Sequence, residues 1–153
     1  MGVYCRYFVT DARDVSLADI ATALKNIDRR FVVEGLDEGE DATHPLYFNW
    51  QLYGNLETYR PGKGPFEEEV NDFIELLTES SAKGKGKAIE GLKRARCTVR
   101  VQLLYAGRGL TATFQGLQPL WSWLIENREG MLQADELGFY EGKNVLVMEE
   151  EYQ

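Results

Sequence analysis

The stretch Thr98-Val-Arg-Val-Gln-Leu-Leu-Tyr105 decides how this chain folds. Apolar and polar residues alternate along it, and the side chains of a β-strand point alternately to the two faces of a sheet. Residues Val3 to Thr10 and Leu46 to Tyr53 carry the same kind of alternation. The pattern predicts a sheet with one face in the core and arginine, amide and tyrosine groups on the other.

The polar members of these three stretches are candidate contact residues. Arginine pairs with carboxylates, and tyrosine supplies rigid area with one polar end, so both suit contacts between proteins. We expect them to form an open sheet face that binds a partner or ligand: Arg6, Tyr47, Asn49, Gln51, Tyr53, Arg100 and Gln102. The same face could instead close a homodimer, because sheet faces bury well against a symmetric copy.

Turn and helix signals between the strands predict an α+β fold. Ser16 and Asp19 form a capping-box-like start for a helix whose apolar residues recur at helical spacing. Pro65 suits the start of a second helix, and Glu67 to Glu69 suit its first turn. We predict a mostly antiparallel sheet with helices on one face, and a split into two small sheets is the alternative. The order β-α-β-β recurs, which suggests a duplicated ferredoxin-like half.

Length and composition indicate one ordinary globular domain. The 153 residues are enough to bury a core as a single domain, 1–153, with a candidate internal joint at the Ser-, Gly- and Lys-rich residues 80–87. Hydrophobic residues make up 44% and charged residues 27%, which argues against disorder. No apolar run could span a bilayer and Met1 to Thr10 has no leader pattern, so we expect a soluble cytoplasmic protein without a membrane partner.

Two local features bear on which side chains reach the surface. Gly54-Asn55 readily takes positive φ, which predicts a hairpin turn at the end of the long aromatic strand. Trp50 and Trp121 fall on apolar stripes and are expected in the core. Trp123 falls off its stripe and is expected to be partly exposed.

No catalytic or cofactor motif rises above background, so no mechanism follows from the sequence. His44 is the only histidine, and its place after an acidic loop predicts an exposed turn residue. Its spacing from Glu34, Asp37 and Asp41 matches no ligand pattern, and we expect neither a metal nor a cofactor. The leading hypothesis is a small binding or regulatory protein that acts through the open sheet face.

Two alternative functions stay open. A small enzyme could form a pocket between the sheet face and loops 37–44 and 107–113, since sites are often built at strand ends. Nucleic acid could bind the basic segment 83–96, although the formal net charge of −8 disfavours such attraction. Cys5 and Cys97 lie in apolar stretches and are expected to be small core residues.

Overall fold

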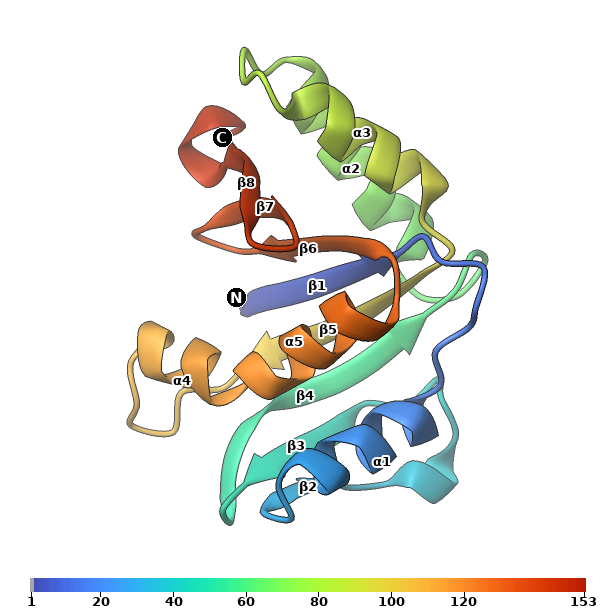
Figure 1. Cartoon of the computed structure of the whole chain (residues 1–153), viewed down its shortest axis with the longest axis vertical. Coiled ribbons are helices and arrows are strands. Elements are labelled where there is room, and N and C mark those ends of the chain that lie inside the picture. The colour runs from blue at the N-terminus through green and yellow to red at the C-terminus, as the bar shows by residue number, and fades with distance from the viewer. Residues whose placement is uncertain (1) are drawn as a thin grey trace.

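The computed structural model describes residues 2–153, which form one eight-stranded antiparallel sheet with five α-helices (Figure 1). The strand order across the sheet is β2-β3-β4-β5-β1-β6-β7-β8. The strands are β1 (Val3–Val9), β2 (Phe31–Val33), β3 (His44–Phe48), β4 (Gln51–Tyr59), β5 (Cys97–Leu103), β6 (Gly130–Ala134), β7 (Gly138–Glu141) and β8 (Asn144–Met148). The helices are α1 (Leu17–Ile27), α2 (Phe66–Thr78), α3 (Lys85–Arg94), α4 (Leu110–Gly116) and α5 (Gln118–Asn127), with short 3-10 helices η1 (Leu36–Glu38) and η2 (Glu149–Glu151).

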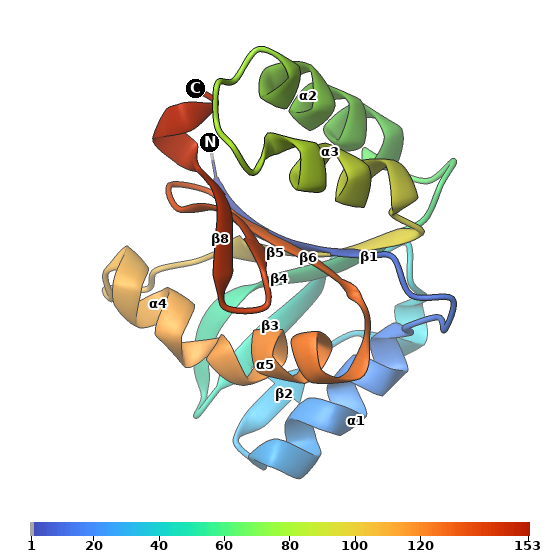
Figure 2. The same cartoon turned by 45° about the horizontal axis from the view of Figure 1, so that its top comes forward.

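The sheet separates two helical layers, which Figure 2 shows above and below it. Helices α1, α4 and α5 cover the face that buries Tyr7, Val99 and Leu132. Helices α2 and α3 cover the other face over Phe8 and Phe139. The predicted α+β class with an antiparallel sheet is confirmed, but helices pack against both faces rather than one. The reason lies in the β-strand period: the neighbours Tyr7 and Phe8 are both buried, under different layers.

Helix α1 begins as the sequence predicts. The Ser16 hydroxyl oxygen accepts a hydrogen bond from the Asp19 N–H at 3.0 Å, and the Asp19 carboxylate accepts one from the Ser16 N–H at 3.1 Å. This reciprocal capping box satisfies two backbone donors that the helix itself leaves free. Leu17, Ile20 and Leu24 then fall on the buried side, so that α1 packs beneath β2 and β3.

The turn between β3 and β4 lies at Asn49-Trp50, where the backbone φ angles are 51° and 68°. Positive φ at both central residues is the geometry of a two-residue hairpin turn. The predicted turn at Gly54-Asn55 is wrong, because β4 continues through both residues. A Cβ atom on Gly54 would lie 2.5 Å from Val101 Cγ1, so this glycine permits the close approach of β4 and β5 instead of a turn.

The two halves of the chain share an order of elements but not a strand placement. The meander β2-β3-β4 runs from the sheet edge inward to β5, whereas β6-β7-β8 runs from β1 outward to the opposite edge. A duplicated ferredoxin-like half therefore stays a prediction. Residues 79–84 join α2 to α3. Among the helices of residues 2–153, none has the length and apolar character of a membrane-spanning segment.

Candidate binding surface

Arg6 and Arg100, two of the predicted contact residues, lie opposite each other on β1 and β5, facing α2. The Arg6 guanidinium donates to the Glu69 carboxylate of α2 at 2.8 Å. It also donates to Gln133 Oε1 at 2.6 Å and to Asp135 Oδ1 at 3.1 Å. The Arg6 side chain is only 9% exposed, so its donors are used inside the fold.

Arg100 is bound from two sides in the same way. Its Nη1 donates to the Glu69 carboxylate at 2.9 Å, and its Nε and Nη2 donate to Glu57 Oε1 at 3.1 and 3.0 Å. Burial works against the charged guanidinium, but the carboxylates of Glu69 and Glu57 outweigh it and raise the pKa of Arg100. The Tyr4 ring lies 4.6 Å from the Arg100 guanidinium carbon and 5.2 Å from that of Arg6.

These groups form an arginine network that fastens α2 to the sheet: Arg6, Glu57, Glu69, Arg100, Gln133 and Asp135. Glu69 is the member of this network that lies on α2, and its carboxylate accepts from both guanidinium groups. The sequence showed Glu69 only as an acid suited to a helix start. The alternation put Arg6 and Arg100 on one face, but no signal in the sequence paired their strands or pointed to the Glu69 carboxylate between them.

Tyr47 and Gln102 lie on the sheet face away from α1. Tyr47 is opposite Val32 of β2, and Gln102 is opposite Asn55 of β4. These side chains are partly exposed, with Tyr4 beside them on β1. We call this region the open face: Tyr4, Val32, Tyr47, Asn55 and Gln102. It covers only part of the sheet face that the sequence predicts to be open.

Trp50 projects from the tip of the β3–β4 hairpin and is 91% exposed, so its predicted place in the core is wrong. The turn at Asn49-Trp50 breaks the strand on which the apolar stripe was based, and the indole therefore points to solvent. Trp121 is fully buried and Trp123 partly buried, as predicted. An exposed tryptophan is unusual, since this side chain is highly buried on average.

Gln51 and Tyr53 lie on the other side of the hairpin, beside Arg108. Tyr53 is buried against α4 in the core layer of α1 and α5, because the turn changes which face its strand position occupies. The Arg108 guanidinium carbon lies 3.6 Å from the centre of the Tyr53 ring, and its Nη2 donates to the Leu52 carbonyl at 2.7 Å. The seven predicted residues are thus split among the network, the open face, the hairpin tip and the core.

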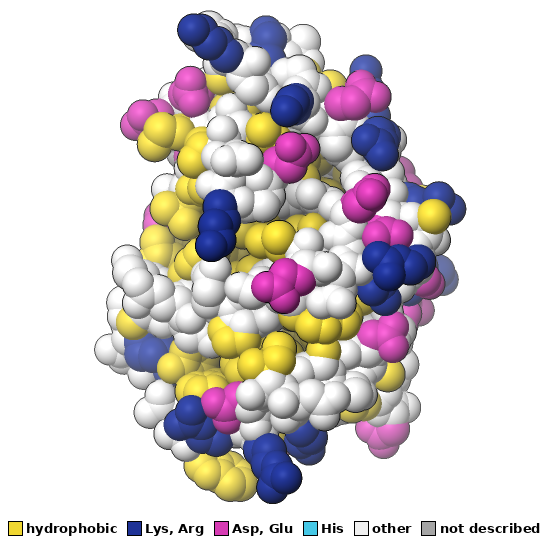
Figure 3. Space-filling model, in the orientation of Figure 1, with side chains coloured by type: hydrophobic (Ala, Val, Ile, Leu, Met, Phe, Trp, Pro, Cys, Tyr) yellow, Lys and Arg dark blue, Asp and Glu magenta, His cyan; other side chains and the backbone are white. Residues whose placement is uncertain are grey.

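A hollow of 420 Å³ lies between the hairpin tip and β2, and we call it the Trp50 hollow. Its walls are Arg29, Arg30, Val32, Glu34, Tyr47, Asn49 and Trp50. Val32 is 38% exposed there, which is high for a strand residue of this size. At the lower end of Figure 3, around β2 and the end of α1, basic side chains flank exposed hydrophobic ones.

A second apolar hollow, of 390 Å³, lies between α4–α5 and β6–β8. Its apolar walls include Phe114, Ile125, Leu132 and Tyr140. Figure 3 shows hydrophobic side chains gathered in a band over this region. Leu137, also a wall, is 37% exposed and Leu132 is buried, so each leaves less apolar surface in contact with water than Trp50 does.

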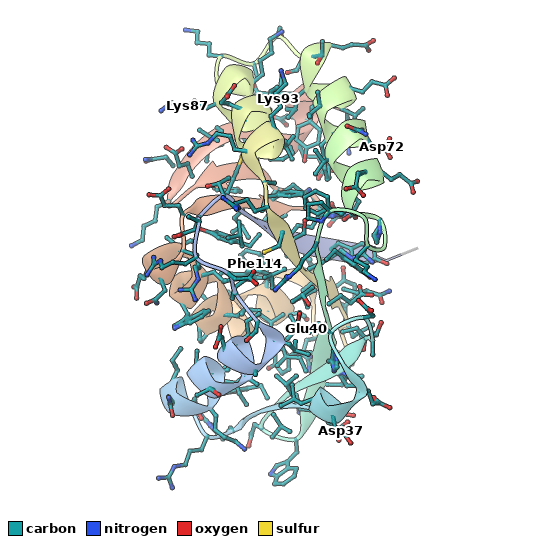
Figure 4. The ribbon with its side chains drawn as sticks, turned by 90° about the vertical axis from the view of Figure 1, so that its right-hand side faces the viewer. Asp37, Glu40, Asp72, Lys87, Lys93 and Phe114 are labelled. Carbon is teal, nitrogen blue, oxygen red and sulfur yellow. The ribbon has the colours of Figure 1, made fainter. Side chains whose placement is uncertain are left out.

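His44 is fully buried, which corrects its prediction as an exposed turn residue. Its Nδ1 lies 3.0 Å from the Glu34 carbonyl oxygen and its Nε2 lies 2.8 Å from the Gly39 carbonyl oxygen. The ring therefore holds the acidic loop against β3, with both nitrogens engaged. In Figure 4, Asp37 and Glu40 of this loop lie far from Asp72, Lys87 and Lys93 on α2 and α3.

The two loops that the enzyme alternative requires lie at opposite ends of β3. His44, at the end of loop 37–44, pairs with Leu56, whereas Arg108 in loop 107–113 contacts Leu52 beside the hairpin tip. Within residues 2–153, no group of three or more His, Cys, Asp or Glu side chains could hold a metal ion.

Both cysteines are buried. Burial raises the pKa of Cys5 to about 12 and that of Cys97 to about 11, which keeps both thiols protonated and unreactive.

Segment 83–96 consists mainly of α3, and the Nζ atom of its Lys87 lies 3.9 Å from Oε1 of Glu141 on β7. Nucleic-acid binding by this segment stays an untested alternative.

Comparison of the chain with protein-family models, with curated proteins and with solved structures gives no match.

Proposed function

We propose that this chain is a protein-binding module whose contact surface is the Trp50 hollow together with the open face beside it. The observation that carries the proposal is the 91% exposure of Trp50 at the tip of a two-residue hairpin. A tryptophan presents roughly 150–250 Å² for burial, and tryptophan, tyrosine and arginine are the residues most enriched at binding hot spots. The surface combines all three types around one hollow.

The position of this surface also supports the proposal. Trp50 sits on a tight turn joining two paired strands, so little conformational entropy is lost when a partner binds it. Tyr47 and Val32 lie on adjacent strands, which fixes their spacing. The arginines of the network are excluded from the contact, because their donors are already used by Glu69, Glu57 and Asp135.

The proposal is tested by co-purification from the protein's own host with three tagged full-length chains: wild type, Trp50→Ala and Leu76→Ala. Leu76 is a matched control because it is an exposed hydrophobic residue, 45% exposed, on the distant helix α2. We expect proteins retained by the wild type to be retained by Leu76→Ala and lost from Trp50→Ala. The same retained set with all three chains would contradict the proposal, provided circular dichroism shows that each is folded.

A further inference from the structure

We propose that the occupant of the Trp50 hollow is a second copy of this chain, related to the first by a two-fold axis. This inference rests on the proposed function and names its partner. Trp50 is both the most exposed large hydrophobic side chain among residues 2–153 and a wall of the hollow. In a symmetric dimer both subunits use the same patch, so each copy can insert its projecting Trp50 into the hollow of the other.

The charges around the hollow are also self-complementary. Arg29 and Glu34 lie just before and just after β2 and both line the hollow. Across residues 2–153, neither side chain has an opposite charge within 4.0 Å. An antiparallel two-fold arrangement sets each Arg29 against the partner subunit's Glu34, which forms two equivalent ion pairs.

Arg30 does not share this role, because it is held within its own chain. Its Nη2 donates to the Asp28 carboxylate at 2.8 Å, and its guanidinium carbon lies 4.7 Å from the centre of the Phe48 ring. The free charges of the hollow are thus one positive and one negative. A foreign partner with strong charge of one sign would be matched by a patch of the opposite sign. One positive and one negative charge instead match a second copy of the same surface.

The contact is made by side chains and not by adding a strand to the sheet. β2 is an edge strand, but the Phe31 N–H already donates to the Asp28 carbonyl at 3.1 Å and Phe31 is buried. The Phe31 N–H is therefore not available to pair with another strand at this edge. The two copies meet through Trp50, Val32 and Tyr47 instead.

The size of the contact predicts a weak dimer. Two inserted tryptophans and the walls they cover bury on the order of 800 Å² in total, less than the ~1,200 Å² of the smallest stable interfaces. We expect a dissociation constant in the range of roughly 10–100 μM, at which concentration governs the oligomeric state.

Sedimentation equilibrium of the full chain at about 5–500 μM and 0.15 M salt tests the inference. We expect a monomer–dimer equilibrium that Leu76→Ala leaves unchanged and Trp50→Ala weakens by about 10-fold or more. Arg29→Glu and Glu34→Arg should each weaken the dimer similarly, since each variant places like charges opposite each other at both symmetry-related positions. An equimolar mixture of these two variants should associate again, because both ion pairs of the mixed dimer are then complementary.

Two results would overturn the inference. One is a wild-type chain that stays monomeric over the whole concentration range. The other is a mixture of Arg29→Glu and Glu34→Arg that associates no more tightly than either variant alone. Neither result decides the proposed function, because loss of foreign proteins from Trp50→Ala in co-purification would still support a contact surface there.

Discussion

Docking of α2 on the sheet should depend on Glu69. In Glu69→Gln the two guanidinium groups lose the carboxylate that accepts from both, at 2.8 and 2.9 Å. The side chains of Arg6, Glu69 and Arg100 are 9%, 13% and 14% exposed, so water replaces the lost charge poorly.

The size of the stability loss depends on the ion pairs that the arginines keep in Glu69→Gln. Removing one partner of a fully buried ion pair costs about 3–5 kcal/mol. Arg6 keeps Asp135 and Arg100 keeps Glu57, which compensate part of the loss. We therefore expect the free energy of unfolding to fall by about 2–3 kcal/mol.

Urea denaturation followed by circular dichroism measures this change. With a slope of roughly 2 kcal/mol per molar urea, the midpoint should fall by about 1 M. Glu68→Gln is the matched control, since Glu68 is an exposed neighbour outside the network. A Glu69→Gln midpoint equal to that of Glu68→Gln would show that the arginine network does not fasten α2 to the sheet.

Three further predictions concern the core. Burial raises the pKa of Tyr152 to about 12 in the folded chain, from 10.0, so its contribution to stability is complete below pH 10 and lost as pH rises to 12. Urea unfolding at pH 9 and pH 11.5 should show a loss of stability between the two pH values that is smaller for Tyr152→Phe than for the wild type, by up to about 2 kcal/mol. Gly54→Ala should lower the free energy of unfolding by about 2 kcal/mol or more in the same assay, because the added Cβ would lie 2.6 Å from the Gln102 carbonyl oxygen, and an effect below 0.5 kcal/mol would contradict this close approach. Cys5 and Cys97 should react with a thiol reagent only as fast as the chain unfolds, and rapid labelling of the native chain would show that they are not buried.

Local chemistry predicted much of the fold. The capping box at Ser16 and the alternation around Arg100 each depend on neighbours in the sequence, and each is confirmed. The same alternation placed Arg6 and Arg100 on one face, where they do lie. What covers that face depends on contacts distant in sequence, so Glu69 and the docking of α2 could not be predicted from strand periodicity.

The candidate surface was harder to predict, because one turn decides it. Asn49 commonly takes positive φ, but Trp50 rarely does, so Gly54-Asn55 was the stronger hairpin signal. Moving the turn by five residues exposes Trp50 and transfers Tyr53 to the core. His44 followed the same logic: its polar neighbours indicated exposure, and only the fold of the loop brings two carbonyl oxygens to its ring.

Site-specific photocross-linking in the protein's own host tests whether the Trp50 hollow is where this chain contacts other proteins. A benzophenone side chain replaces Val32 inside the hollow or, as the control, Leu76 on α2, and the adducts are identified by mass spectrometry. We expect adducts from position 32, a second copy of the chain among them, and none above background from position 76. Equal adducts from both positions, or none from position 32, would contradict this expectation.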